Sequence, residues 1–329
     1  MKVSRFLPVR RLSELMFTGM ALAVASLPAQ AEPNYPERAV QVIVPFAAGG
    51  GLDLNARRFS QALSDVLGES VFVNNRAGAA GTIGMQQLAR TTADGYTLAF
   101  SPAVPLTSEP HRMSQLSYAL SDFQPVCQIF DNIFGIAVHQ NSKVQSFEEL
   151  MDRAKNDPTP PAYGTSGTGS IPHLGVSDIE AETGLAFNHI PYKGDGPMMH
   201  DLLAERLDFG VILASSATAT IESGMLKLLA VFSANRHPYF PDVPTIKELG
   251  VNVEQPSFGG LFVPKNTPEP IVKKLEQACE AASANDAYQQ WAAQNNQVLD
   301  FLNAAAFQER LEHDSRLKKA TIQRLGLSN

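Results

Sequence analysis

The sequence is poor in the residues from which metal and redox sites are built. Its 329 residues include two cysteines, Cys127 and Cys279, and seven histidines. There is no His-x-x-x-His pair, no His-Glu-x-x-His motif and no Cys/His spacing typical of zinc. We therefore expect no metal site and no cofactor. The sequence leaves open whether the cysteines pair, although two isolated cysteines in a protein of this size are more often buried and unpaired.

Positive charge is also scarce. Lysine and arginine number 26 against 33 aspartate and glutamate residues, which gives a formal net charge of -7. Nucleic-acid binding normally requires a basic surface, so this balance argues against it. Long-range steering does not favour anionic ligands either, and a bound anion would have to be held by local dipoles.

Long hydrophobic runs are missing beyond the N-terminal segment. Four basic residues precede an apolar run from Leu15 to Leu27, too short for a bilayer core that needs about 20 helical residues. Ala29-Gln30-Ala31 then has the form that signal peptidase accepts. We interpret residues 1–31 as a secretory signal cleaved after Ala31. Cleavage would remove those basic residues and Glu14, leaving an exported, soluble chain with a net charge of about -10.

Strand and helix patterns alternate along the rest of the chain. An apolar strand at 40–44 is followed by a helical face from Leu52 to Leu67, which Gly68 closes. A strand at 71–73, a helix ending near residue 91 and a strand at 96–100 complete a β-α-β-α-β unit. This order implies a parallel sheet with right-handed crossovers.

The second half of the chain continues the alternation. Ser146 and Glu149 have the spacing of a helix N-cap and its N3 partner, and a further helix is predicted to open at Pro172. The pattern also predicts strands at 133–138, 187–191, 209–213 and 226–232, helices at 198–207 and 271–283, and further helices over 286–325 with Trp291 in the core.

Two glycine-rich junctions join strands to helices, "PFAAGGGLD" at 45–53 and "GTSGTGS" at 164–170. A helix N-terminus exposes unsatisfied N–H groups, and glycines before it let the backbone approach a ligand, so each junction could cradle an anion without Lys or Arg. Helix capping without any ligand is the alternative. Neither junction completes a nucleotide motif, because the Walker lysine is replaced by Ser170 and Gly-x-Gly-x-x-Gly is not satisfied.

Individual side chains at these junctions have two interpretations each. Asp53 is either a helix N-cap or a ligand group, and His173 is either a ligand contact or a core histidine. Tyr192 lies in a loop, 192–196, that could form a third edge of the same site. Ser166 and Ser170 could donate to an anion; as nucleophiles they would make the chain an exported serine hydrolase, although neither lies in Gly-x-Ser-x-Gly.

Six blocks follow one another along the chain after the signal segment: "YPERAVQVIVPFAAGGGLDLNARRF", "VFVNNRAGAAGTIGMQQLARTTADGYTLAF", "YGTSGTGSIPHLG", "HIPYKGDGPMMHDLLAERLDFGV", "LKLLAVFSANRHPYFPDVPTIKELG" and "FGGLFVPKNTPEPIVKKL". Through these ordered blocks the whole chain after the signal segment resembles one family, the extracytoplasmic solute-binding proteins of tripartite tricarboxylate transporters, also called the Bug family.

The resemblance implies an α/β fold of the type II periplasmic-binding-protein kind, in which two lobes close on a ligand. We expect lobe 1 over 33–134 plus 257–329 and lobe 2 over 135–256. It also implies a periplasmic, non-enzymatic monomer that captures a small organic carboxylate for a membrane permease, although a ligand-sensing accessory of a membrane regulator is an alternative. The predicted ligand-binding residues are Phe46, Ala48, Gly49, Gly50, Gly51, Asp53 and Ser101 of lobe 1, and Thr165, Ser166, Gly167, Thr168, Gly169, Ser170, His173 and Tyr192 of lobe 2.

One block departs from the family pattern. Relatives commonly carry Phe-Asp in the strand where this chain has "VILASS" at 211–216. The loss of that acid implies a more apolar pocket. The missing acid makes an amino acid a less favoured ligand. It favours a ligand with a hydrophobic body, such as an aromatic carboxylate or a dicarboxylate of the terephthalate type.

Overall fold

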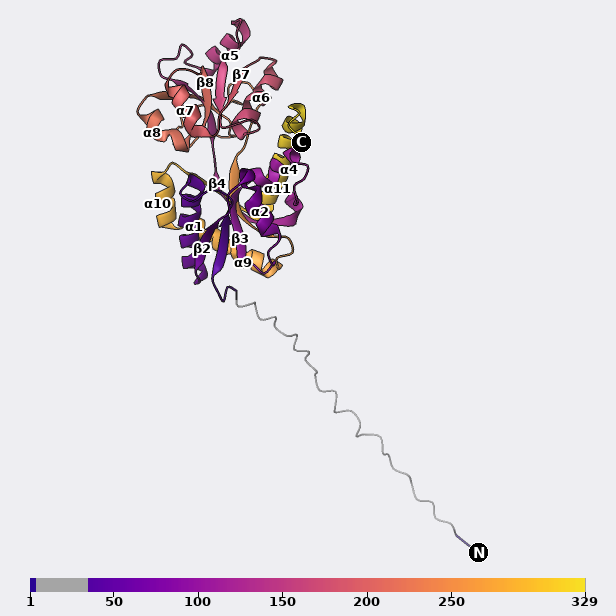
Figure 1. Ribbon diagram of the computed structural model, residues 1–329. Coiled ribbons are helices and arrows are strands. Elements are labelled where there is room, and N and C mark those ends of the chain that lie inside the picture. Colours follow the sequence, from indigo (N-terminus) through magenta and orange to yellow (C-terminus); the bar gives the residue numbers. More distant parts are fainter. Residues whose placement is uncertain (4–34, 329) are drawn as a thin grey trace. The chain divides into compact units, whose positions relative to one another are not determined.

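The computed structural model describes residues 1–3 and 35–328 (Figure 1). The predicted signal segment and its cleavage after Ala31 lie outside the described residues. The chain from Tyr35 onward forms one compact unit. Within the described part of the chain, every helix is too short or too polar to cross a membrane.

Strands and helices alternate through this unit, as the sequence pattern predicts. The strands are β1 (Val40–Val44), β2 (Val71–Asn75), β3 (Thr97–Pro102), β4 (Phe123–Asp131), β5 (Phe134–His139), β6 (Ala162–Thr165), β7 (Asn188–Pro191), β8 (Phe209–Leu213), β9 (Leu226–Val231), β10 (Phe258–Pro264) and β11 (Val298–Asn303). The α-helices are α1 (Gly51–Leu67), α2 (Thr82–Ala89), α3 (Val104–Thr107), α4 (Glu109–Arg112), α5 (Phe147–Asn156), α6 (Ile171–Thr183), α7 (Asp195–Leu203), α8 (Thr218–Glu222), α9 (Glu269–Ser283), α10 (Asp286–Gln294) and α11 (Ala304–Arg324).

Two sheets organise the unit. The first has the order β11-β4-β10-β3-β1-β2, and the second has the order β7-β6-β8-β5-β9. We call the first sheet with its helices lobe 1, and the second with its helices lobe 2. The prediction of parallel pairing is confirmed for the first β-α-β-α-β unit, in which β1 pairs in parallel with β2 and β3. Both sheets are nevertheless mixed, because β10 joins β3 and β5 joins β8 in antiparallel fashion.

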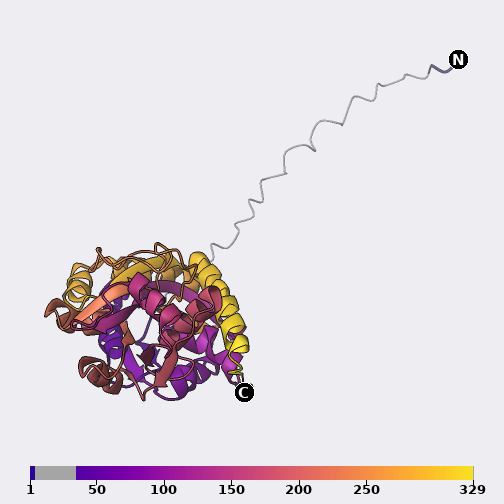
Figure 2. The same ribbon diagram turned by 90° about the horizontal axis from the view of Figure 1, so that it is seen from above.

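Helices cover both faces of each sheet. In lobe 1 the side chains of α1 and α9 pack on one face, while those of α2, α3 and α11 pack on the other. In lobe 2 the helices α5 and α6 cover one face and α7 the other. Figure 2 shows α11 as a long yellow helix along the outside of the molecule. Its last turns reach lobe 2, where Arg324 and Thr321 contact Asp178 of α6 at 2.5 and 2.8 Å.

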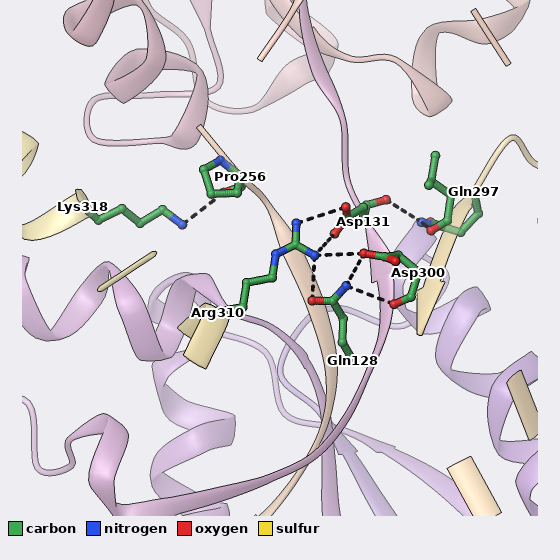
Figure 3. A network of polar contacts seen from close by, with 8 residues as sticks. Gln128, Asp131, Pro256, Gln297, Asp300, Arg310 and Lys318 are labelled. Carbon is green, nitrogen blue, oxygen red and sulfur yellow. Dashed lines mark hydrogen bonds and ion pairs between the residues drawn. The ribbon is translucent and has the colours of Figure 1, made fainter. Parts of the chain in front are cut away.

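The chain crosses between the sheets at two places, after β4 and before β10. Arg310 of α11 binds the first crossing, since its guanidinium lies 2.9 Å from Asp131 and also donates to Gln128 at 2.8 Å (Figure 3). The ring of Phe258, the first residue of β10, lies 4.2 Å from that guanidinium. Lys318 donates to the carbonyl oxygen of Pro256 in the second crossing at 3.3 Å. One helix therefore fixes both crossing segments.

The prediction of an all-helical region over 286–325 is wrong. It contains β11, six residues that pair with the edge of β4 between α10 and α11. Leu299 and Phe301 pack into one core and Leu302 into another, a two-sided arrangement that a helical face does not provide. The sequence patterns also left β4, α3 and α4 unassigned.

The sequence left open whether the two cysteines pair, and the structure answers the question, because Cys127 and Cys279 form a disulfide. Both residues are fully buried, Cys127 in β4 and Cys279 in α9. The bond fastens α9 to the sheet across 152 residues of sequence. This pairing follows from the packing of α9 on β4, a long-range contact that cysteine spacing does not encode.

Replacing both cysteines by alanine should lower the free energy of unfolding by about 3 to 5 kcal/mol, because a long closed loop restricts the unfolded chain. Urea unfolding of the double variant and the wild type measures the difference. Reducing agent should shift the midpoint of the wild type and leave that of the double variant unchanged. Equal midpoints for the two oxidised proteins would contradict the assignment of a stabilising disulfide.

Candidate functional site

A cleft of about 720 Å³ lies where residues of both lobes face one another. Lobe 1 contributes residues from the β1-α1 junction, from the 102–112 segment and from α10. Lobe 2 contributes the second glycine junction, the first residue of α7 and the residues at and after the end of β8. Much of the lining is apolar, with Phe46, Leu52, Leu54, Val104, Phe130, Phe134, Ile171, Pro172, Leu213 and Trp291 among its residues.

The first glycine junction opens α1. Gly50 is the N-cap, and Asp53 lies in the first turn rather than at the cap, so the N-cap interpretation of Asp53 is wrong by three positions. Its buried carboxylate accepts from the Gly49 N–H at 2.8 Å, from Arg57 at 3.0 Å and from Asn75 at 2.9 Å. Burial raises the pKa of Asp53, but these hydrogen bonds outweigh it and hold the pKa below its ordinary value. Asp53 thus fixes the shape of the junction from behind.

The second glycine junction opens α6. Ser170 is the N-cap, and its hydroxyl donates to the Gly167 carbonyl at 2.7 Å, which closes a tight loop before the helix. Gly167 and Gly169 have φ values of +136° and +76°, in the region that favours glycine. The positive end of the α6 dipole therefore faces the cleft with the backbone of a small-residue loop in front of it.

Two stacked imidazoles support this loop from below. The rings of His173 and His189 lie 4.0 Å apart between centroids and are nearly parallel. Nδ1 of His173 accepts a hydrogen bond from the Gly169 N–H at 2.9 Å. Nε2 of His189 lies 2.7 Å from the hydroxyl oxygen of Thr165. Desolvation lowers the pKa of both rings, and that of His189 falls to about 4. His173 therefore acts on the loop as an acceptor in its neutral form.

The cleft brings together seven of the predicted ligand-binding residues: Phe46, Gly51, Ser166, Gly167, Thr168, Gly169 and Ser170. The other eight lie beside or behind its lining: Ala48, Gly49, Gly50, Asp53, Ser101, Thr165, His173 and Tyr192. Ser101 is fully buried and bonds to the carbonyl of Pro102, and the Tyr192 hydroxyl donates to Asp201 at 2.8 Å. Contact with a ligand stays a prediction for all of them.

Sequence reasoning missed a charged pair on α4. Glu109 is buried and lies 3.0 Å from Arg112, and both line the cleft. The other end of the guanidinium crosses to lobe 2, where it donates to the Thr168 carbonyl at 3.3 Å. Within the described chain the buried Nε of Arg112 has no hydrogen-bond partner. Helix α4 has only four residues and therefore no periodic pattern, so the sequence provided no signal for Glu109 or Arg112.

The prediction that Trp291 belongs to the core holds in part. The residue is half-buried and packs against the core of lobe 1, and it also lines the cleft from α10. The pattern that predicted α10 is correct, but its apolar face meets both the core, through Tyr288, and the cleft.

The described residues show neither a metal-binding cluster nor a histidine base beside Ser170. Residues 35–328 contain no cluster of three or more His, Cys, Asp or Glu side chains that could hold a metal ion. The Ser170 hydroxyl is engaged with a backbone carbonyl, and the two nearby imidazole nitrogens are engaged with Gly169 and Thr165. In this arrangement neither histidine serves as a base for Ser170.

Two α/β lobes joined by crossing strands, with a cleft between them, are the architecture of periplasmic solute-binding proteins. The model of the family described as "Tripartite tricarboxylate transporter family receptor" matches residues 55–327, and the chain belongs to this family.

Individual relatives agree with that assignment. Protein BugT of Bordetella pertussis is 36% identical over 286 residues, which are 85% of this chain and 87% of the relative. A TctC solute-binding protein from Polaromonas, solved without ligand, has a TM-score of 0.81 at 30% identity and covers 88% of this chain and 99% of its own. R. palustris Rpa4515, solved with adipate, has a TM-score of 0.75 at 28% identity, with 89% and 98% covered.

The stacked histidines predict a pH dependence of stability. Because the pKa of His189 is about 4 in the folded protein and about 6.5 when unfolded, the unfolded chain binds more protons between these values. The free energy of unfolding should therefore fall as the pH falls from 6.5 toward 4. The ionisable groups that face His189 and its stacking partner His173 are Tyr163, which stacks on His189, and Arg112, which acts on His173.

Urea unfolding at about pH 7 and about pH 5 measures this loss. His189→Gln should show a smaller loss than the wild type, while His200→Gln, which removes a largely exposed imidazole on α7, should match the wild type. An unchanged loss in His189→Gln would show that its protonation is not linked to folding.

Proposed function

We propose that the protein captures a small organic carboxylate in the cleft between its lobes and delivers it to the membrane permease of a tripartite tricarboxylate transporter. In this proposal it works as a periplasmic monomer after removal of residues 1–31, and it catalyses no reaction. The observation that carries the proposal is the meeting of Arg112 and the glycine loop before α6 at one cleft.

The chemistry of the cleft supports an anion with an apolar body. The positive end of a helix dipole and a guanidinium are both suited to a carboxylate. The lining around them is rich in aromatic and aliphatic side chains, which would remove a hydrocarbon body from water. The relative solved with adipate, a carboxylate with an aliphatic body, fits the same description.

Backbone amides distinguish carboxylates poorly from one another, so the ligand's body must be selected by side chains. Phe46 and Leu54 of lobe 1 face the cleft together with Phe134 and Leu213. An aromatic carboxylate or an aliphatic dicarboxylate would fill this space. Closure of the lobes would then bury both the anion and the body, which is how a solute-binding protein holds its cargo.

Purified protein should be stabilised by a subset of mono- and dicarboxylates. At a concentration one hundred times the dissociation constant, a ligand that binds only the folded state adds about 2.7 kcal/mol to the free energy of unfolding. Thermal unfolding across the panel measures this, with the corresponding carboxamides as controls. If all carboxylates leave the transition unchanged, or if the protein turns over an ester or amide, the proposal fails.

Gly169→Ala should weaken carboxylate binding at least tenfold, because a Cβ there would lie 2.7 Å from Cζ of Arg112 and would displace the guanidinium. The positive φ adds a backbone strain of about 1 to 2 kcal/mol.

Gly184→Ala is the matched control, since Gly184 has a φ of +70° at the other end of α6 and nothing lies within 4 Å of its would-be Cβ. It should lose similar stability but keep wild-type affinity. Equal affinity in the two variants would remove the Arg112 contact from the binding site.

A further inference from the structure

Asp195 is placed at the cleft by the loop that joins β7 to α7. The carboxyl ends of β6 and β7 lie side by side, with Thr165 paired to Pro191, so the loops that follow them are neighbours. Asp195 is the first residue of α7 and lines the cleft together with Ser166 of the glycine loop. The sequence indicated this loop as part of the site, with Tyr192 as its predicted ligand-binding residue. The Tyr192 hydroxyl instead donates a hydrogen bond to Asp201.

The charges in the cleft do not balance. Of the described residues that line it, three are ionisable: Glu109, Arg112 and Asp195. Glu109 and Arg112 pair with one another at 3.0 Å. Among the ion pairs of residues 35–328, none includes Asp195. Its exposed carboxylate therefore has no cationic side-chain partner, and only the N-terminal dipole of α7 offsets its charge. Although Asp195 is exposed at the cleft, partial desolvation by the surrounding protein raises the pKa of its carboxyl, and the Ser166 hydroxyl offsets part of that effect.

Because the Asp195 carboxylate has no cationic side-chain partner, it can discriminate among ligands that share a carboxylate group. When the lobes close and water leaves, a second anionic group near Asp195 would be repelled, whereas a cationic donor would be attracted. The opposite holds at Arg112 and the α6 N-terminus, which favour an anion. The cleft therefore presents one site for an anion and one for a cation, with apolar surface from Leu54, Phe134 and Trp291 in the same lining.

We propose that Asp195 is a specificity-determining residue that accepts hydrogen bonds from an ammonium group of the ligand, so that the ligand class is an amino-carboxylate with an apolar body. This inference rests on the proposed carboxylate-binding function and refines it. It also changes the expectation from the sequence that the loss of an acid after β8 disfavours an amino acid, because Asp195 supplies a carboxylate from a different loop.

The test uses ligand pairs that differ only in the nitrogen. 6-Aminohexanoate differs from hexanoate by an ammonium group far from the carboxylate, and phenylalanine differs from 3-phenylpropanoate by an ammonium group close to it. Calorimetric titration of each ligand into wild type, Asp195→Asn and Glu182→Gln gives the affinities. Glu182 is an exposed carboxylate on α6 outside the cleft lining, so its variant controls for the change in net charge.

The wild type should bind at least one amino-carboxylate about tenfold or more tightly than its partner without nitrogen, the strength expected of a hydrogen bond between charged groups. Asp195→Asn should lose this preference, and Glu182→Gln should retain it. The melting temperature of Asp195→Asn should stay close to that of the wild type, because Asp195 is exposed and has no ion-pair partner among the described residues.

Other results overturn the inference. These are an unchanged preference in Asp195→Asn, a wild type that binds neither amino-carboxylate better than its partner, or adipate that binds more tightly than 6-aminohexanoate. A further contradicting result is an adipate affinity that rises at low pH in the wild type but not in Asp195→Asn. It would mean that Asp195 shares a proton with the second carboxylate of the ligand and does not bind an ammonium group. In each of these cases carboxylate binding itself survives, whereas the failure of every carboxylate to bind rejects the proposed function.

Discussion

The ion pair between Arg310 and Asp131 holds the point at which the chain crosses between its two sheets, and the cleft depends on that point. The same guanidinium contacts Gln128, Asp300 and the ring of Phe258, so one side chain joins β4, β11 and β10. Charge-assisted hydrogen bonds of this planar, forked group constrain direction as well as distance. The network therefore fixes the relative directions of β4, β10 and β11 at the crossing.

The cleft uses the two lobes for different tasks. Lobe 2 offers a helix N-terminus whose loop is shaped by glycines and supported by the His173–His189 pair. Lobe 1 offers Arg112, which reaches across to that loop, and an apolar wall from the β1-α1 junction and α10. Neither lobe alone holds the complete set of groups. A ligand that needs all of them favours the arrangement in which the lobes are together.

Local patterns predicted much of the fold. Val40–Val44, the apolar face of α1 and Gly68 at its end are as expected, as is Ser146, whose hydroxyl accepts from the Glu149 N–H at 3.1 Å. The features that the sequence did not predict depend on long-range packing: β11 exists because it pairs with β4, and the disulfide because α9 packs on that strand. The same holds for the site. The glycine loop was visible as a motif, but Arg112 and Asp195 are brought to it by the fold.

If one small carboxylate is held by both lobes at once, a crystal structure of the protein with the tightest ligand of the panel will show it. We expect the ligand's carboxylate within hydrogen-bond distance of backbone N–H groups in the 167–171 segment or of Arg112, with its body against Phe46 and other residues of lobe 1. A ligand bound to one lobe alone, or in the cavity of about 470 Å³ bordered by Arg236 and Arg310 at the crossing strands, would contradict this expectation.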